Sequence, residues 1–282
     1  MVKIITDTTS CLSREVAERY SIPVIPQVVN LGEKSYLEGV ELDNAAFMNW
    51  LRTSKELPKT AAPPPELFSA EFERLSASGG TVLCIHPSAE VSGTVRSATV
   101  AAQDFPNLDI RIVDTRLIGS PLGTMVEQAA RWAEEGVDAD TIIARLQDMT
   151  SRCRVYFLVA TLEFLARGGR IGGAAALVGS MLQIKPILTV RNGRVDQFER
   201  ERTQKRAVAR LKQLVIEQCP CDGAGLLTIM HAGVPEEGQA LADELGERLN
   251  QPVVPVYDVP PAIVTHAGPG ILAAAFFVEG KS

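Results

Sequence analysis

The sequence predicts an α/β protein built from two α/β domains. Short apolar segments of strand length alternate with helical segments along the chain, a pattern typical of a parallel sheet with helices on both faces. The chain has 282 residues, more than one average domain. With 46% hydrophobic and 22% charged residues, it can form sizeable cores. We therefore expect an N-terminal domain with a mostly parallel sheet over residues 1–150 and a C-terminal domain over residues 151–282.

In the N-terminal half, the predicted strands and helices follow one another closely. The strands are expected at residues 2–7, 24–29, 81–85 and 110–114, and the helices at 14–19, 47–51, 66–75, 94–102, 122–133 and 139–149. Ser13 is placed to cap the first helix, and Pro26 makes the second strand an edge or broken strand. Residues 59–65 form a proline-rich segment that we expect to be a stiff loop. In parallel sheets ligands bind at the carboxyl ends of the strands, where Asp7, Thr8, Ser92 and Asp114 are expected.

The C-terminal half shows the same alternation with more glycine. Strands are expected at residues 155–159, 185–190, 195–198, 226–230 and 253–257, and helices at 162–166, 174–183, 203–217 and 236–249. Asn192-Gly193 is a hairpin signal between two of these strands. Residues 167–173 form a glycine-rich turn that contains Arg170.

The segment from Thr265 to Gly270 is the most informative part of the chain. Proline suits the first turn of a helix, so Pro269 predicts an apolar helix over residues 271–277. A buried helix N-terminus carries unpaired N–H groups and a partial positive charge, which favour an anion. His266 lies just before this point. The segment therefore predicts a site for a molecule with an acidic head and an apolar body.

The other candidate site residues each allow two interpretations. Ser92, in Ser92-Gly93-Thr94, is either an ordinary helix cap or a hydroxyl donor to an anion. His266 is either structural or a ligand contact. Arg170 lies in a turn that is either a solvated surface feature or part of a site, and Thr60 is either a simple loop hydroxyl or a ligand donor.

Composition excludes several classes of protein. A net charge of −6 argues against general nucleic-acid binding, although residues 191–210 gather seven Arg and Lys residues. The five cysteines are odd in number and scattered, which predicts reduced thiols and no metal site. The sequence has no charge-free run of about 18 apolar residues and no signal-peptide pattern, so we expect a soluble cytoplasmic protein.

Taken together, the motifs resemble those of the DegV family, and they occur in the expected order along the whole chain. The segments that carry this resemblance are Ile5–Thr9, Ser92–Thr94, Leu162–Leu165, Gly168–Ile171, Ile184–Leu188 and His266–Gly270. The resemblance implies two α/β domains with a ligand pocket between them. It also implies that one long-chain fatty acid is bound there without catalysis by this chain and without a metal or cofactor.

The resemblance also implies roles for individual residues. Thr60, Ser92 and Gly93 would bind the fatty-acid carboxylate, with His266 beside it. Arg170 and Arg202 would lie near the pocket mouth or the face that docks a partner. That partner is a separate subunit of bacterial fatty acid kinase, which would phosphorylate the bound carboxylate. Peripheral contact with a membrane for lipid exchange is a further expectation.

The chain departs from the family pattern around the expected head-group site. Ala61, Ala62 and Val91 stand where the family often has polar residues, which predicts a more apolar site and leaves open which fatty acid is bound. The apolar segments 174–182 and 271–277 are candidate walls of the acyl tunnel, with ordinary core packing as the alternative for most of their positions.

Two other functions are alternatives to fatty-acid binding. A serine hydrolase acting on a lipid would use Ser92, His266 and an aspartate such as Asp114, but the segment Glu90-Val91-Ser92 lacks the glycine that begins a nucleophile elbow. A nucleotide-binding or lipid-sensing regulatory protein is the other alternative. The sequence contains neither a Walker motif nor a dinucleotide fingerprint to support nucleotide binding.

Overall fold

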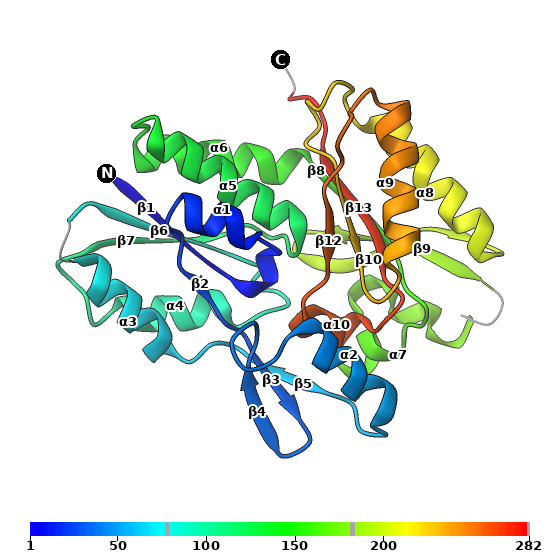
Figure 1. The fold of residues 1–282 in the computed structure, drawn as a ribbon, viewed down its shortest axis with the longest axis horizontal. Coiled ribbons are helices and arrows are strands. Elements are labelled where there is room, and N and C mark those ends of the chain that lie inside the picture. The colour runs from blue at the N-terminus through cyan, green and yellow to red at the C-terminus, as the bar shows by residue number, and fades with distance from the viewer. Residues whose placement is uncertain (77–78, 181–183, 281–282) are drawn as a thin grey trace.

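The computed structural model describes residues 1–76, 79–180 and 184–280. The strands in this part of the chain form three sheets, with the orders β2-β1-β6-β7, β10-β9-β8-β13-β11-β12 and β4-β3-β5. Figure 1 shows the first sheet and its helices on one side of the molecule and the second sheet on the other. The prediction of a mixed α/β fold is confirmed.

The first sheet is parallel, as the alternating pattern predicts. Its strands are β2 (Val24–Ile25), β1 (Val2–Asp7), β6 (Thr81–His86) and β7 (Asp109–Asp114). Its helices are α3 (Pro65–Ser76), α4 (Thr94–Ala102), α5 (Ser120–Glu134) and α6 (Ala139–Arg152). Because successive strand residues point to opposite faces, Val82 and Cys84 pack with α3 and α4, whereas Leu83 and Ile85 pack with α5 and α6. The sheet is therefore covered on both faces.

The second sheet is mixed. Its strands are β10 (Arg194–Glu201), β9 (Lys185–Arg191), β8 (Cys153–Leu158), β13 (Leu272–Phe277), β11 (Thr228–His231) and β12 (Val256–Asp258). Only β11 and β12 pair in parallel, because β9 and β10 form the predicted hairpin and β13 runs against both of its neighbours.

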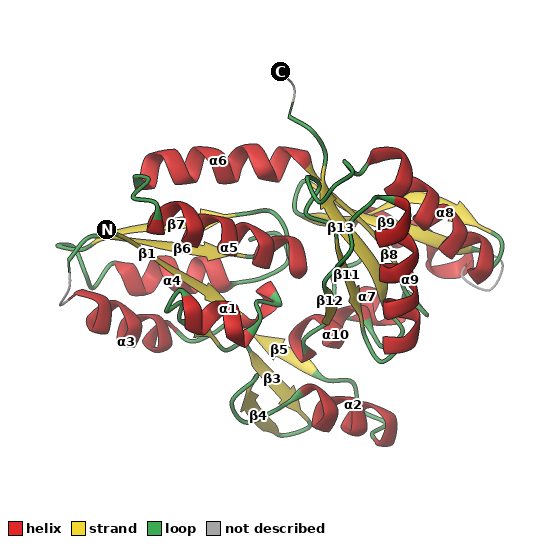
Figure 2. Ribbon diagram, turned by 45° about the horizontal axis from the view of Figure 1, so that its top comes forward, coloured by secondary structure: helices red, strands yellow, loops and turns green. Residues whose placement is uncertain are grey.

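The helices α8 (Gln204–Gln218) and α9 (Pro235–Arg248) cover one face of the second sheet. Tyr156 and Leu158 of β8 point to that face. Val155 and Phe157 point to the other face, which is turned toward the first sheet and its loops (Figure 2). The functional site lies on this other face.

Most of the remaining elements gather against the same face. They are β3 (Val28–Leu31), β4 (Lys34–Leu37), α2 (Asn44–Thr53), β5 (Lys59–Ala61), α7 (Glu163–Arg167), η2 (Gly172–Ser180) and α10 (Pro261–Ala267). The other two, η1 (Thr8–Ser10) and α1 (Arg14–Arg19), lie beside the first sheet with α5. Val29 of β3 and Phe47 of α2 share an apolar cluster with Val155 and Phe157. The segment 59–65 is therefore not all loop, since residues 59–61 pair with β3.

The segment that follows Pro269 is a strand, and the predicted apolar helix over residues 271–277 is wrong. Strand β13 lies between β8 and β11 and is buried along its whole length. A short apolar run that is buried on both faces cannot be told from a buried helix by periodicity. The helix instead precedes the segment as α10, which ends where Gly268 adopts a φ of +80°.

The segment 174–183 also differs from its prediction. Residues 172–180 form a 3₁₀ helix, η2, in place of an α-helix. Residues 181–183 of the predicted helix lie outside the described residues.

Candidate functional site

An apolar cavity of about 120 Å³ lies between the uncovered face of the second sheet and the loops of the first. Strand side chains form its floor, and the loop before α5 and helix α10 close its sides. Its apolar lining includes Val155, Phe157, Met230, Ile263, Ile271 and Ala273. Of the two segments expected as tunnel walls, 271–277 contributes Ile271 and Ala273, whereas no residue of 174–180 lines the cavity.

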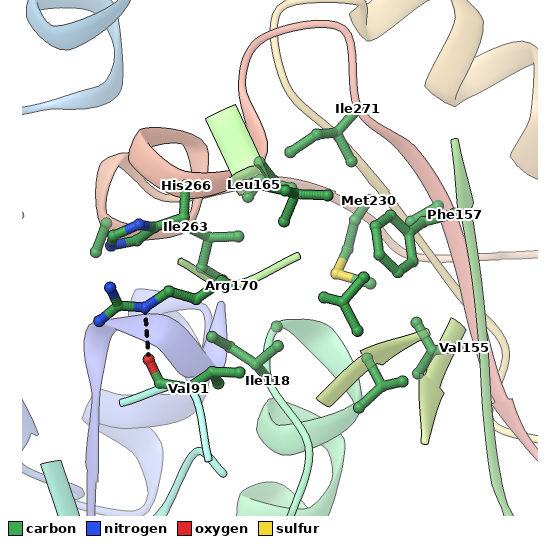
Figure 3. Close-up of a pocket in the computed structure, with 17 residues that line it drawn as sticks. Val91, Ile118, Val155, Phe157, Leu165, Arg170, Met230, Ile263, His266 and Ile271 are labelled. Atoms are coloured by element: carbon green, nitrogen blue, oxygen red, sulfur yellow. Dashed lines mark hydrogen bonds between the residues drawn. The ribbon is translucent and has the colours of Figure 1, made fainter. Parts of the chain in front are cut away.

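Polar side chains reach the cavity at one end. Figure 3 shows Arg170 and His266 together there, with Phe157 and Val155 at the opposite end. Arg170 donates from Nε to the carbonyl of Val91 at 3.3 Å, and from Nη1 to the carbonyl of Gly168. The arginine therefore links the turn after α7 to the loop after β6.

His266 contacts Thr60 across the polar end. Its Nε2 lies 2.6 Å from Oγ1 of Thr60, so two residues that the resemblance assigned to the same site are hydrogen-bonded. Burial, reinforced by the positive charge of Arg170, lowers the pKa of His266 to about 4. The imidazole is therefore neutral near neutral pH.

The surroundings of the ring indicate its tautomer. Nδ1 of His266 is buried and has no hydrogen-bond partner among the described residues. It faces Gly168, where an added Cβ would lie 2.5 Å from Nδ1. A proton on Nδ1 would be a buried donor without an acceptor, so we place the proton on Nε2. Nε2 then donates to Thr60, whose own hydroxyl hydrogen remains available for a ligand.

His266 does not lie at a helix N-terminus. It is in the last turn of α10, whose C-terminal end carries a partial negative charge. The predicted anion attraction by a helix dipole at this point is therefore wrong. Hydrogen-bond donors and the charge of Arg170 remain as the groups that favour an anion.

Ser92 and Gly93 lie beside the polar end, at the start of α4. Gly93 is the N-cap residue, and an added Cβ there would lie 3.1 Å from Cβ of Ala62, so the helix start packs against the segment that carries Thr60. Oγ of Ser92 is 2.7 Å from Oγ1 of Thr94. Thr60 and Ser92 do not themselves line the cavity, whereas their neighbours His266 and Val91 do.

Arg202 stands apart from this group. It is exposed in the turn between β10 and α8 and does not line the cavity. Its role in docking a partner stays a prediction.

The geometry does not assemble a serine hydrolase in the described part of the chain. Ser92 is bonded to Thr94 and His266 to Thr60, with no hydrogen bond between Ser92 and His266. Asp114 accepts from the backbone N–H of Arg116. A nucleophile needs a base within reach and a third group that orients the base, and neither contact is present.

Glu38 is a residue at this site that the sequence analysis missed. It is 2% exposed, and its Oε1 accepts the backbone N–H of Ala262 at 2.6 Å, in the first turn of α10. Thr8 donates a short hydrogen bond to the other oxygen. Burial raises the pKa of Glu38 to about 7. Glu38 thereby anchors the helix that carries His266, and no local sequence motif marks it.

None of the helices in the described part of the chain is long and apolar enough to cross a membrane. No group of three or more His, Cys, Asp or Glu side chains in that part of the chain could hold a metal ion.

Comparison with known proteins agrees with the resemblance in the sequence. The family model described as "Uncharacterised protein, DegV family" matches residues 1–279. A DegV domain-containing protein of Streptomyces coelicolor is 36% identical over 276 residues, covering 96% of each chain. Protein DegV of Bacillus subtilis is 33% identical over 274 residues, covering 96% of this chain and 97% of the relative.

Solved structures give the same result. A DegV family protein from Thermus thermophilus, described by its fatty acid binding, matches with a TM-score of 0.89 and 32% identity over 99% of both chains. DegV of Bacillus subtilis, described as a fatty acid binding protein, matches with a TM-score of 0.88 and 32% identity over 99% of both chains.

Proposed function

This chain belongs to the DegV family, and from that membership we propose that it binds a long-chain fatty acid in the cavity. The observation that carries the proposal is the polarity of the cavity, which has Arg170 and His266 at one end and apolar side chains elsewhere. In this orientation the carboxylate lies at the polar end and the acyl chain extends toward Phe157.

The polar end meets the needs of a carboxylate. A buried carboxylate must be hydrogen-bonded to remain charged, and each hydrogen bond to a charged group contributes about 1.5–3 kcal/mol. Thr60, Ser92 and the backbone at Gly93 supply donors in the proposal, with the neutral His266 behind Thr60. Arg170 supplies the positive charge that the helix end cannot.

The apolar part of the cavity contributes affinity in proportion to the methylenes that it buries. Each buried methylene contributes about 0.8 kcal/mol before the cost of association. The length of the acyl chain should therefore control affinity, and the head group should control orientation.

The proposal includes presentation of the bound carboxylate to a separate kinase subunit, which would form an acyl phosphate on it. The chain itself would be non-catalytic and need no cofactor. The supporting observation is that Thr60, Ser92 and His266 are only partly buried, so a partner could reach the head group. The exposed Arg202 would contribute to docking. The domain boundary near residue 150, a cytoplasmic location in a bacterium and peripheral membrane contact for lipid exchange belong to the same proposal.

Native mass spectrometry tests the ligand directly. The purified chain should retain a fatty acid, or take up one equivalent of added palmitic or oleic acid. The substitution Arg170→Met, which removes the guanidinium group, should weaken that binding. Exchange of the exposed Arg202 as Arg202→Met is the matched control, because it should leave the affinity for the acid unchanged. A chain that carries no lipid and ignores both acids would rule out the proposal.

A further inference from the structure

A buried hydrogen-bond network of polar side chains leads from the end of β1 to Ser92. Asp7 and Thr94 are fully buried, and Gln27 is 3% exposed. Nε2 of Gln27 lies 3.0 Å from Oδ1 of Asp7 and 2.8 Å from Oγ1 of Thr94. Oγ1 of Thr94 in turn lies 2.7 Å from Oγ of Ser92. This network thus ends at the Ser92 hydroxyl, beside the polar end of the cavity.

The direction of each hydrogen bond follows from its anchor at Asp7. Oδ1 of Asp7 accepts the backbone N–H of Thr9 at 3.0 Å, so it is an acceptor and the amide nitrogen of Gln27 must face it. An amide nitrogen has two hydrogens, and the second one goes to Oγ1 of Thr94. Thr94 therefore accepts from Gln27. The hydrogen of its fully buried hydroxyl has no acceptor among the described residues other than Oγ of Ser92, so Thr94 donates to Ser92, whose own hydrogen is only partly buried.

The hydroxyl of Ser92 is left with one free hydrogen-bonding group, its hydrogen. Its Oγ accepts from the hydroxyl of Thr94 and from the backbone N–H of Thr94 at 3.3 Å. A hydroxyl has two lone pairs and one hydrogen. Both lone pairs are engaged, and the hydrogen has no acceptor among the described residues. Ser92 is therefore set as a donor, which suits an anion.

Other contacts hold this hydrogen-bond network in place. Oδ2 of Asp7 is 2.7 Å from Nδ1 of the buried His86, so the second oxygen of the carboxylate is also fixed. The backbone N–H of Gln27 donates to Oγ1 of Thr8 at 3.1 Å. These contacts hold the side chains of Asp7, Gln27 and Thr94 in place, so both lone pairs of Ser92 are engaged before a ligand arrives and its hydroxyl hydrogen is directed away from Thr94.

We propose that Asp7, Gln27 and Thr94 are positioning residues that hold the Ser92 hydroxyl as a donor and so make the site select a carboxylate over a neutral head group. The proposal rests on the proposed function, because it assigns the anion to a bound fatty acid. It adds a source of head-group selectivity in residues that do not line the cavity.

The test compares two ligands with the same tail, palmitic acid and hexadecanol, in calorimetric titrations. Thr94→Val keeps the shape of the side chain and removes its hydroxyl. It should weaken binding of palmitate by about tenfold, equivalent to about 1.4 kcal/mol, and leave hexadecanol unchanged. Thr94→Ser should restore the preference for the acid. Thr99→Val is the control on the exposed side of the same helix, where the hydroxyl donates to the carbonyl of Val95.

A double variant separates positioning from general packing. In the Ser92→Ala background, Thr94→Val should cause no further change in the ratio of the two affinities, because the hydroxyl that it orients is gone. If Thr94→Val fails to fold, Gln27→Met removes the amide donors at similar volume and should lower the same ratio.

Two results would overturn the positioning role. One is an equal loss of affinity for acid and alcohol in the folded Thr94→Val or Gln27→Met variant. The other is an unchanged preference for the acid in either variant. Failure of the proposed function looks different, since the unaltered chain would then bind neither ligand.

Discussion

Ala273 offers a direct way to shorten the acyl-binding part of the cavity. It lies in the centre of β13, is 2% exposed and faces the cavity, whereas the next residue, Ala274, faces α8 and α9. Ala273→Leu would add three carbon atoms to the apolar wall. The larger side chain would therefore occupy space that the acyl chain fills in the proposal.

The expected loss follows from the number of methylenes displaced. Three methylenes at about 0.8 kcal/mol each give about 2.4 kcal/mol, which is roughly a 50-fold weaker affinity for a chain that fills the cavity. A fatty acid shorter by about three carbons should bind as before, because it does not need the lost space. The free energy of unfolding should change little, since the added carbons enter a void.

A titration series of saturated fatty acids from decanoic to stearic acid measures this effect. The preferred chain length should decrease in the Ala273→Leu variant. Ala274→Leu is the matched substitution on the opposite face. It overpacks a filled core and should destabilise the fold by about 1–3 kcal/mol without changing the preferred length. An unchanged length profile in Ala273→Leu would refute the assignment of this cavity to the acyl chain.

Two other predictions concern the head-group end. In Gly168→Ala the added Cβ would lie 2.5 Å from Nδ1 of His266, so the ring must leave Thr60 and fatty-acid affinity should fall by about 10- to 100-fold in titrations. Gly179→Ala is the control, because its added Cβ would lie in open space. Equal affinity in both variants would contradict the role of the His266 ring. Because burial raises the pKa of Glu38 from 4.5 to about 7, its protonated form stabilises the fold below about pH 4.5 and this contribution is lost as the pH rises through about 7. Urea unfolding of Glu38→Gln should therefore show a smaller loss of stability between about pH 5 and about pH 8 than the unaltered chain, and parallel pH profiles would contradict this.

Local patterns predicted the first sheet and its helices well, but not the antiparallel sheet of β3, β4 and β5. Strand-length apolar runs and capping residues such as Ser13 identify elements through contacts close in the sequence, and the first sheet is built largely from such units. The strand β13 could not be identified in this way. Its alanines favour a helix in isolation, and only its place between β8 and β11 makes it extended.

The candidate site also depends on contacts between residues that are far apart in the sequence. Thr60 and His266 were both named from the sequence, but their hydrogen bond joins β5 to α10 and no local pattern predicts it. Glu38 and Gln27 were missed because a lone carboxyl or amide outside any motif looks like a surface residue. Their burial arises only when the segment after β2 folds against Asp7 and α10.

A crystal structure of the chain with palmitic acid would show whether the cavity binds a fatty acid with its carboxylate at the end formed by Arg170 and His266. The carboxylate should lie within hydrogen-bond distance of the Thr60 and Ser92 hydroxyls, with the acyl chain running past Ala273 toward Phe157. A palmitate bound in the reverse direction, or bound outside this cavity, would contradict it.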